Sequence, residues 1–206
     1  MTGKHLDSAI ARFIDSTGDD VWSDTSFLDT LIRICAERLF AICRADARGW
    51  LSEGDLQSMF YAILRRELPQ RGMPACAVHA GYPCRIPGHH IRELGKRSRN
   101  LRVDLGIVVP HTIRILRRRQ WEGQLVAAIE VKRCHERLRE IKSDLDKLAA
   151  IRTAWPDVRV YMLVMGYHSD LEDIAAVERT AAAMDIPLLQ DNYLGRSDHV
   201  DQGELV

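Results

Sequence analysis

The chain has 206 residues, of which 46% are apolar, and its 29 basic and 29 acidic side chains leave no net charge. This composition excludes a disordered, collagenous or low-complexity chain. No apolar run approaches the roughly 20 residues that a membrane span needs, and the N-terminus has no apolar signal core. The five cysteines lack a tight repeated spacing, which favours reduced thiols over a disulfide framework. We therefore expect a globular, cytoplasmic protein with no membrane partner.

Two helices are predicted in the first part of the chain. Apolar residues recur at spacings of three and four over residues 26–44, which is typical of a helix with a broad buried face. Over residues 52–68 the apolar spacing is again helical, and Ser52 and Asp55 have the spacing of a capping box. The first helix belongs to an N-terminal helical extension, residues 1–50. This extension either enlarges the core or forms an interface with a protein partner or a second copy of the chain.

The pattern changes from helical to extended after residue 74. Apolar runs bounded by proline, glycine or charged residues predict strands at 75–82, 103–109, 125–132, 158–165 and 186–189. Helical spacing predicts helices at about 136–153 and 170–184, between the later strands. The run at 158–165 is nearly all apolar, which is typical of a strand covered on both faces. These elements predict an α/β domain over residues 51–194, followed by a polar tail over residues 195–206.

The absence of net charge hides an uneven distribution. Residues 61–160 carry 21 basic and 10 acidic side chains, whereas residues 1–60 and 161–206 are net acidic. A central block this basic attracts a polyanion locally, even though the whole chain has no net field. The alternative is that the arginines only coat solvated helix faces, and charge alone does not separate the two interpretations.

Two of the predicted strands carry charged residues that suggest a catalytic or metal-binding site. Asp104 begins the run Asp-Leu-Gly-Ile-Val-Val, and Glu130 and Lys132 lie within Ala-Ala-Ile-Glu-Val-Lys. Because side chains alternate along a strand, Glu130 and Lys132 share one face while their apolar neighbours share the other. If the two strands are neighbours, Asp104 brings a second carboxylate within about 5 Å of the first. Two carboxylates that close favour a cation between them, and their hard oxygens select Mg²⁺ or Mn²⁺.

These residues resemble the PD-(D/E)XK nuclease superfamily, which has the restriction-endonuclease-like fold. Its motif is an Asp on one strand and Glu-X-Lys or Asp-X-Lys on the next, often with an acid on a preceding helix. Asp104 and Glu130-Val131-Lys132 match this motif. Val103 stands where the best-known form has its proline, and the helix after the motif lacks the Gln-X-X-X-Tyr pattern of one branch. The resemblance covers roughly residues 50–190 and implies a central mixed sheet flanked by helices.

The resemblance also implies an activity, the metal-assisted hydrolysis of phosphodiester bonds by a nuclease. DNA is expected as the substrate in preference to RNA, because it is the commoner substrate of the family. Asp104, Glu130 and the backbone carbonyl of Val131 would hold Mg²⁺ or Mn²⁺. Lys132 would orient or help deprotonate the attacking water and offset charge on the phosphate.

The helical acid of the motif has two candidates. Glu53 lies three and seven residues before Leu56 and Phe60, on the apolar face that rests against the sheet. Asp55 is rotated away from that face and suits the N-cap. We therefore expect Glu53 to ligate the cation directly or through water.

Contacts with nucleic acid are expected from arginines near the two motif strands, because phosphate contacts give affinity without reading sequence. These arginines precede the Asp104 strand or lie between the motif strands, and they are Arg97, Arg99, Arg102, Arg114, Arg117, Arg118 and Arg119.

Other interpretations stay open at this point. The main rival is a nucleic-acid-binding or assembly subunit that keeps the nuclease fold but does not cleave, or cleaves only with a partner. A third is a small interaction module in which the motif is a coincidence. Zinc-binding side chains are present at Cys76, Cys84, His89 and His90, but their spacing is unlike that of structural zinc sites. The zinc interpretation is therefore the weaker one.

Overall fold

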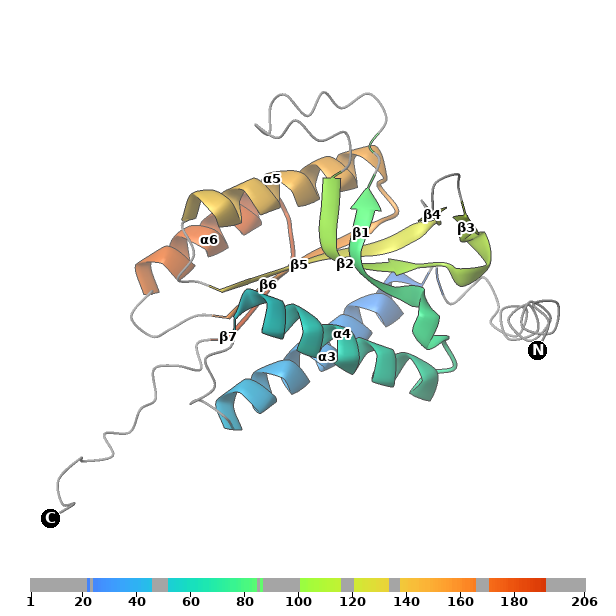
Figure 1. Cartoon of the computed structure of the whole chain (residues 1–206). Coiled ribbons are helices and arrows are strands. Elements are labelled where there is room, and N and C mark those ends of the chain that lie inside the picture. Colours follow the sequence, from blue (N-terminus) through green and yellow to red (C-terminus); the bar gives the residue numbers. More distant parts are fainter. Residues whose placement is uncertain are drawn as a thin grey trace, which may run out of the picture.

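Figure 1 shows the computed structural model, which describes residues 22, 24–45, 52–84, 86, 101–115, 121–133, 138–165 and 171–191. The described part has the expected α/β class, with a five-stranded mixed sheet flanked by helices. The strands of this sheet are β1 (Val78–Cys84), β2 (Leu101–Val108), β5 (Leu125–Arg133), β6 (Arg159–Met165) and β7 (Leu188–Asp191). The helices are α3 (Thr25–Ala45), α4 (Glu53–Gln70), α5 (Leu138–Ala154) and α6 (Leu171–Ala183).

The strand order in the sheet is β1-β2-β5-β6-β7. β2 pairs antiparallel with both β1 and β5, whereas β5, β6 and β7 run parallel to one another. Each parallel pair is joined by a helix, α5 between β5 and β6 and α6 between β6 and β7, because parallel neighbours need a long crossover. The two motif strands, β2 and β5, are therefore neighbours in the sheet.

Helices cover both faces of the sheet. α3 and α4 lie against one face, and α5 and α6 lie against the other (Figure 1). In β6, Tyr161 and Leu163 pack in the core with α3 and α4, whereas Met162 and Val164 pack with α5 and α6. This alternation explains the nearly all-apolar run at 158–165, because both faces of the strand are buried.

The helix of the N-terminal extension contributes to this core. α3 shares one hydrophobic cluster with α4 and the sheet. The residues that α3 buries are Leu28, Leu31, Ile32, Cys35, Ala36, Leu39, Phe40 and Cys43. A polar clamp also fixes the helix, since the Asp29 carboxylate accepts hydrogen bonds from Arg159 and from the Tyr161 hydroxyl of β6. Of the two roles left open for this segment, enlargement of the core is the one that its burial supports.

The predicted helices and strands are confirmed to within three residues at each end. Residues Ala75–Ala77, expected as the start of a strand, instead form a 3-10 turn, η1, ahead of β1. A short hairpin of β3 (Arg114–Ile115) and β4 (Trp121–Glu122), preceded by the 3-10 turn η3 (Pro110–Thr112), was not predicted. Each strand of the hairpin has two residues, which is too short for a period to be visible in the sequence.

Two other expectations concern the chain as a whole. The cysteines in the described part, Cys35, Cys43, Cys76 and Cys84, are free thiols, and Cys134 lies outside the described residues. Among the described helices, none has the length and apolar character needed to cross a membrane. The tail at residues 195–206 lies outside the described residues.

Candidate active site

The N-terminal end of α4 presents Glu53 to the sheet. Ser52 caps the helix in a capping box, in which the Asp55 carboxylate accepts from the Ser52 backbone N–H at 2.7 Å and the Ser52 hydroxyl accepts from the Asp55 N–H at 3.2 Å. Asp55 is thus engaged by the cap, as expected. Glu53 instead accepts hydrogen bonds from Lys132 Nζ on both carboxylate oxygens, at 2.9 and 3.0 Å, and from Gln57 Nε2 at 2.9 Å.

Asp104 and Glu130 meet where the pairing of β2 with β5 begins. The first pair of this ladder is Leu105 with Ile129, so the two acids are the next residues along their strands. The Val131 backbone N–H donates to Asp104 Oδ2 at 2.8 Å, which holds the carboxylate against β5. Ile129 and Val131 point into the core with α3 and α4. Glu130 and Lys132 instead contact residues of α5, as the alternation along the strand predicted.

Helix α5 adds an acid and a lysine that were not among the predicted site residues. Lys147 Nζ lies 2.6 Å from Glu130 Oε1 and 2.7 Å from Asp144 Oδ1. The other oxygen of Asp144, Oδ2, lies 3.2 Å from Lys132 Nζ. These contacts form an alternating series, Glu53, Lys132, Asp144, Lys147 and Glu130, which we call the acid–lysine chain. Asp104 lies at its end, beside Glu130.

The sequence did contain a signal for these two residues. The apolar residues Ile141, Leu145, Leu148 and Ile151 form the buried stripe of α5. Asp144 lies three residues after Ile141, and Lys147 lies four before Ile151, so the same stripe contains both charges. Both residues are less than a tenth exposed. Charged residues on a buried helical stripe are almost never present without a partner.

Burial dominates the electrostatics of the acid pair. Glu130 is 1% exposed, and its burial, with the charges of Asp104 and Asp144, raises its pKa well above the usual range, although Lys147 opposes this. Burial likewise raises the pKa of Asp104, against the hydrogen bond from Val131 N–H and the charges of the two lysines. For Lys147, burial lowers the pKa, but the Glu130 and Asp144 carboxylates outweigh burial and raise it. The strands thus hold two acids together in a place that disfavours their ionised forms.

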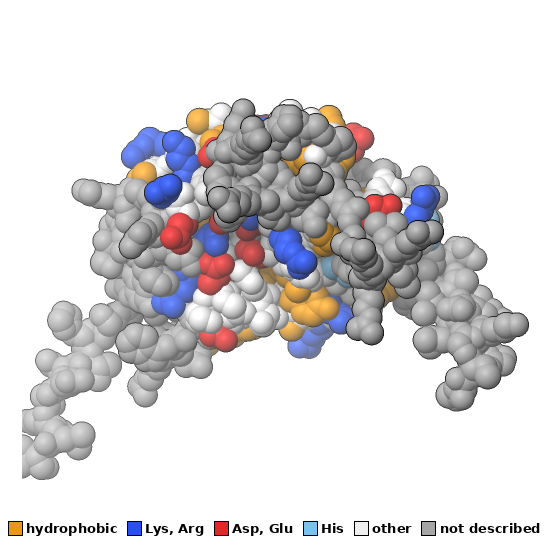
Figure 2. Space-filling view, turned by 45° about the horizontal axis from the view of Figure 1, so that its top comes forward, with side chains coloured by type: hydrophobic (Ala, Val, Ile, Leu, Met, Phe, Trp, Pro, Cys, Tyr) orange, Lys and Arg blue, Asp and Glu red, His pale blue; other side chains and the backbone are white. Residues whose placement is uncertain are grey.

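The charges of the cluster are not balanced by its own side chains. When all groups are ionised, the four carboxylates of Glu53, Asp104, Glu130 and Asp144 exceed the two lysine charges by two. One divalent cation would supply the missing charge, and carboxylate oxygens are the ligands that Mg²⁺ and Mn²⁺ prefer. Figure 2 shows acidic and basic side chains lying side by side across the middle of the face that it presents.

The donor set suits a magnesium-type ion better than an all-protein cage. Within the described part of the chain, no three His, Cys, Asp or Glu side chains are grouped closely enough to hold a metal by themselves. Mg²⁺ does not need such a group, because it is usually held by one or two carboxylates, with water and phosphate oxygens completing the octahedron. Asp104 and Glu130 provide such a pair, and Val131 lies directly between Glu130 and Lys132 on β5. The residues therefore fit the ion that the motif implies.

The other expected binding residues are only partly described. Arg102 is exposed on β2, with Nη1 3.4 Å from the Gly81 carbonyl oxygen, and Arg114 is exposed on β3. The remaining predicted arginines lie outside the described residues, and they are Arg97, Arg99, Arg117, Arg118 and Arg119. For the zinc interpretation, Cys84 is buried, and burial raises the pKa of its thiol to about 12, whereas His89 and His90 lie outside the described part.

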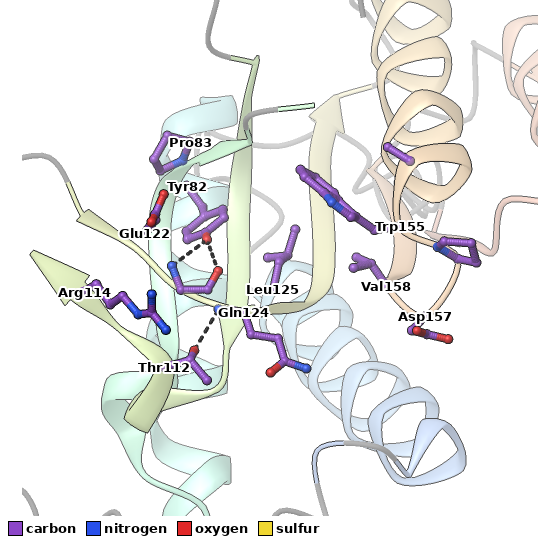
Figure 3. A pocket seen from close by; sticks show the side chains of 13 residues that line it. Tyr82, Pro83, Thr112, Arg114, Glu122, Gln124, Leu125, Trp155, Asp157 and Val158 are labelled. Carbon is purple, nitrogen blue, oxygen red and sulfur yellow. Dashed lines mark hydrogen bonds between the residues drawn. The ribbon is translucent and has the colours of Figure 1, made fainter. Parts of the chain in front are cut away.

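A separate cavity of about 610 Å³ lies at the other end of β5, between the β3–β4 hairpin and the turn from α5 to β6 (Figure 3). Its wall includes Leu125, which is five residues, or about 17 Å of extended strand, from Glu130. The exposed charges that line it are Arg114, Glu122 and Asp157. One guanidinium beside two carboxylates does not favour a phosphate. We therefore place the candidate active site at the acid–lysine chain and not in this cavity.

Comparisons with known proteins do not indicate a function, so the functional argument depends on the residues of the site. No family model matches the chain, and neither the curated proteins nor the solved structures contain a significant match.

Proposed function

We propose that the protein is a metal-dependent nuclease with a restriction-endonuclease-like fold, which hydrolyses phosphodiester bonds of DNA in preference to RNA. The observation that carries the proposal is the meeting of Glu53, Asp104, Glu130 and Lys132. These four positions come from α4, β2 and β5, and Glu53 and Lys132 are 79 residues apart in the sequence. If the motif matched by chance, the acid on the preceding helix, Glu53, would not be expected to contact the motif lysine, Lys132.

The order of elements supports the same proposal. The resemblance implies a central mixed sheet flanked by helices, with the motif on two successive strands and an acid on a helix that precedes them. In this chain α4 precedes the antiparallel strands β1, β2 and β5, and α5 then leads to β6, which is parallel to β5. The motif residues lie at corresponding places, with Asp104 on β2 and Glu130 and Lys132 on β5.

Each residue has a role that its contacts permit. Asp104 and Glu130, with the Val131 carbonyl, would hold Mg²⁺ or Mn²⁺, and Glu53 would contribute through water. A divalent ion bound there would stabilise negative charge on the phosphate and activate water. Lys132 Nζ lies within 3.2 Å of carboxylate oxygens of Glu53 and Asp144, so its ammonium is held in place to donate to the attacking water or to a phosphate oxygen.

Cleavage of four substrates tests the proposal. Supercoiled plasmid, linear duplex, single-stranded DNA and RNA are incubated with Mg²⁺, Mn²⁺ or EDTA and the wild type, Lys132→Ala or Lys142→Ala. Lys142 is an exposed lysine on α5 and serves as the matched control. We expect metal-dependent cleavage by the wild type and Lys142→Ala but not by Lys132→Ala. Equal cleavage by all three proteins would contradict the assignment of Lys132.

One observation favours a second candidate, a nucleic-acid-binding subunit that is silent or depends on a partner. Glu53, Asp144 and Glu130 each already have a lysine partner within 3.2 Å, with Lys132 and Lys147 shared among the three acids. Each of these carboxylates therefore has a counterion from the protein without a bound metal ion. If no protein cleaves, binding to the same substrates in Ca²⁺ separates the candidates. Binding without cleavage would support the second candidate, and absence of binding would contradict both.

A further inference from the structure

We propose that Lys147 sets the cation preference of the Asp104–Glu130 pair, favouring Mg²⁺ over Ca²⁺ by occupying one oxygen of Glu130. The inference rests on the proposed function, because it takes this pair as the metal site. Lys147 is not part of the motif, and it lies on α5, outside the two motif strands. It acts on the ion through Glu130 and is therefore a positioning residue.

Glu130 has only one oxygen to offer a metal ion. Its side chain is 1% exposed, so solvent does not compete for it. Oε1 lies 2.6 Å from Lys147 Nζ. An ammonium at that distance excludes a second cation from Oε1 by both volume and charge, which leaves Oε2 for a metal.

Lys147 is held in place by the acid–lysine chain. Asp144 Oδ1 fixes its ammonium at 2.7 Å, in addition to the contact with Glu130, and the residue is 9% exposed. Asp144 is itself fixed by Lys132 at 3.2 Å, and Lys132 by Glu53. An isolated lysine would rotate freely about its flexible stem. Within the acid–lysine chain, movement of Lys147 would leave the buried Glu130 carboxylate without its counterion and the buried Asp144 carboxylate with only one of its two lysine partners.

The two ions differ in the coordination that they require. Ca²⁺ takes six to eight oxygen ligands and often binds a carboxylate through both oxygens, whereas Mg²⁺ requires a near-ideal octahedron and keeps several waters. A Glu130 restricted to Oε2 is a one-oxygen ligand, which suits the octahedral ion. Removal of the ammonium would free Oε1 and permit two-oxygen binding, so Ca²⁺ would gain more than Mg²⁺. The added negative charge would strengthen binding of both ions, and the ratio of their dissociation constants therefore isolates the effect.

A metal-binding measurement tests the inference without any nuclease assay. Free Mn²⁺ is counted by electron paramagnetic resonance as it is titrated into the full chain, and Mg²⁺ and Ca²⁺ are then added as competitors. The variants are Lys147→Met, Asp144→Asn and Lys142→Met. The second variant keeps Lys147 charged but weakens one of its anchors, which provides a milder test if Lys147→Met does not fold. The third is an exposed lysine on the same helix.

We expect wild type and Lys142→Met to share one Ca²⁺/Mg²⁺ ratio of dissociation constants. Changes in the partner of a metal-binding carboxylate alter affinity by about 10- to 100-fold, so we expect Lys147→Met to lower this ratio by about tenfold and Asp144→Asn by a smaller factor. Saturable Mn²⁺ binding by wild type with an unchanged ratio in both variants would overturn the role of Lys147 alone. No Mn²⁺ binding by the wild type would overturn the metal site and, with it, the proposed function.

Discussion

Lys132 Nζ and Asp144 Oδ2 lie 3.2 Å apart, and this contact joins the motif strand β5 to the helix that follows it. On its other side, Lys132 Nζ is held by both oxygens of Glu53. The ammonium group is therefore positioned by the protein before any substrate is present. A catalytic group that is already oriented does not lose conformational freedom when the substrate binds, so we expect substitutions at Asp144 to affect turnover more than substrate affinity.

The first prediction concerns the acid pair. Asp104→Asn and Glu130→Gln keep the shape of each side chain but remove a negative charge from the expected metal site. We expect each change to lower Mg²⁺-dependent cleavage by about a hundredfold or more, as loss of an ionic metal ligand does, while circular dichroism shows an intact fold. Asp146→Asn, on the same helix as Asp144, is the control and should retain activity. Unchanged turnover in either site variant would reject that residue as a ligand.

The second prediction is a dependence of stability on pH. Burial is the main cause that raises the pKa of Glu130 above its usual 4.5 and that of Asp104 above its usual 3.8. Such acids bind protons more readily in the folded than in the unfolded state. The free energy of unfolding therefore rises as pH falls through the raised pKa values toward 4.5. We expect the Tm of the metal-free protein, measured in EDTA, to increase from about pH 8 to about pH 5.

One other described group titrates inside that pH window, because burial lowers the pKa of His79 below its usual 6.5 and the fold loses stability as pH falls through that range. This effect opposes the increase in Tm, so the comparison with Glu130→Gln isolates the acid. The following groups act outside the window. The pKa of Lys147 is raised from 10.5, so the stability it contributes is lost only as pH rises through that higher value. The carboxyls of Asp29 and Asp55 have lowered pKa values and lose their contribution only below the usual 3.8. Glu130→Gln should flatten the increase in Tm. An equal slope in wild type and variant would show that the pair does not titrate as expected.

The third prediction concerns the clamp between α3 and β6. Asp29 accepts hydrogen bonds from Arg159 and Tyr161, and Tyr161 is only 2% exposed. Asp29→Ala would leave the buried hydroxyl without this partner, which costs about 1–3 kcal/mol of the free energy of unfolding. Urea denaturation measures the loss. Glu37→Ala, an exposed acid on the same helix, should change stability by less than about 0.5 kcal/mol.

The fourth prediction concerns nucleic-acid binding by the basic block. The triple change of Arg117, Arg118 and Arg119 to Ala should weaken DNA binding in Ca²⁺ and reduce the slope of log K against log salt by about 2 to 3, or about 0.9 for each phosphate that is no longer neutralised. Arg33→Ala combined with Arg66→Ala removes two exposed arginines of α3 and α4 and should leave the slope unchanged. If the slope of the triple variant equals that of the wild type, this run does not contact phosphate.

Much of the sheet could be predicted because its strands are short apolar runs between breakers. The choice of Glu53 over Asp55 was also possible, since helical spacing puts Glu53 on the buried face while Asp55 caps the helix with Ser52. Asp144 and Lys147 were missed because charges on a predicted helix are usually solvated, and only the spacing from apolar residues distinguishes these two. The partner of Lys147, Glu130, comes from another element, and such a pairing follows from the docking of α5 on the sheet and not from local sequence.

The position of α5 also has a consequence for how the chain folds. Glu130 becomes buried when β5 pairs with β2 and β6, and its counterion arrives only with Lys147 on the helix that connects β5 to β6. A buried carboxylate without a partner is costly, so closure of the sheet around Glu130 and docking of α5 should occur as one cooperative step. Partly folded chains would then lack both the strand pairing and the assembled site, and the nascent protein would have no active intermediate.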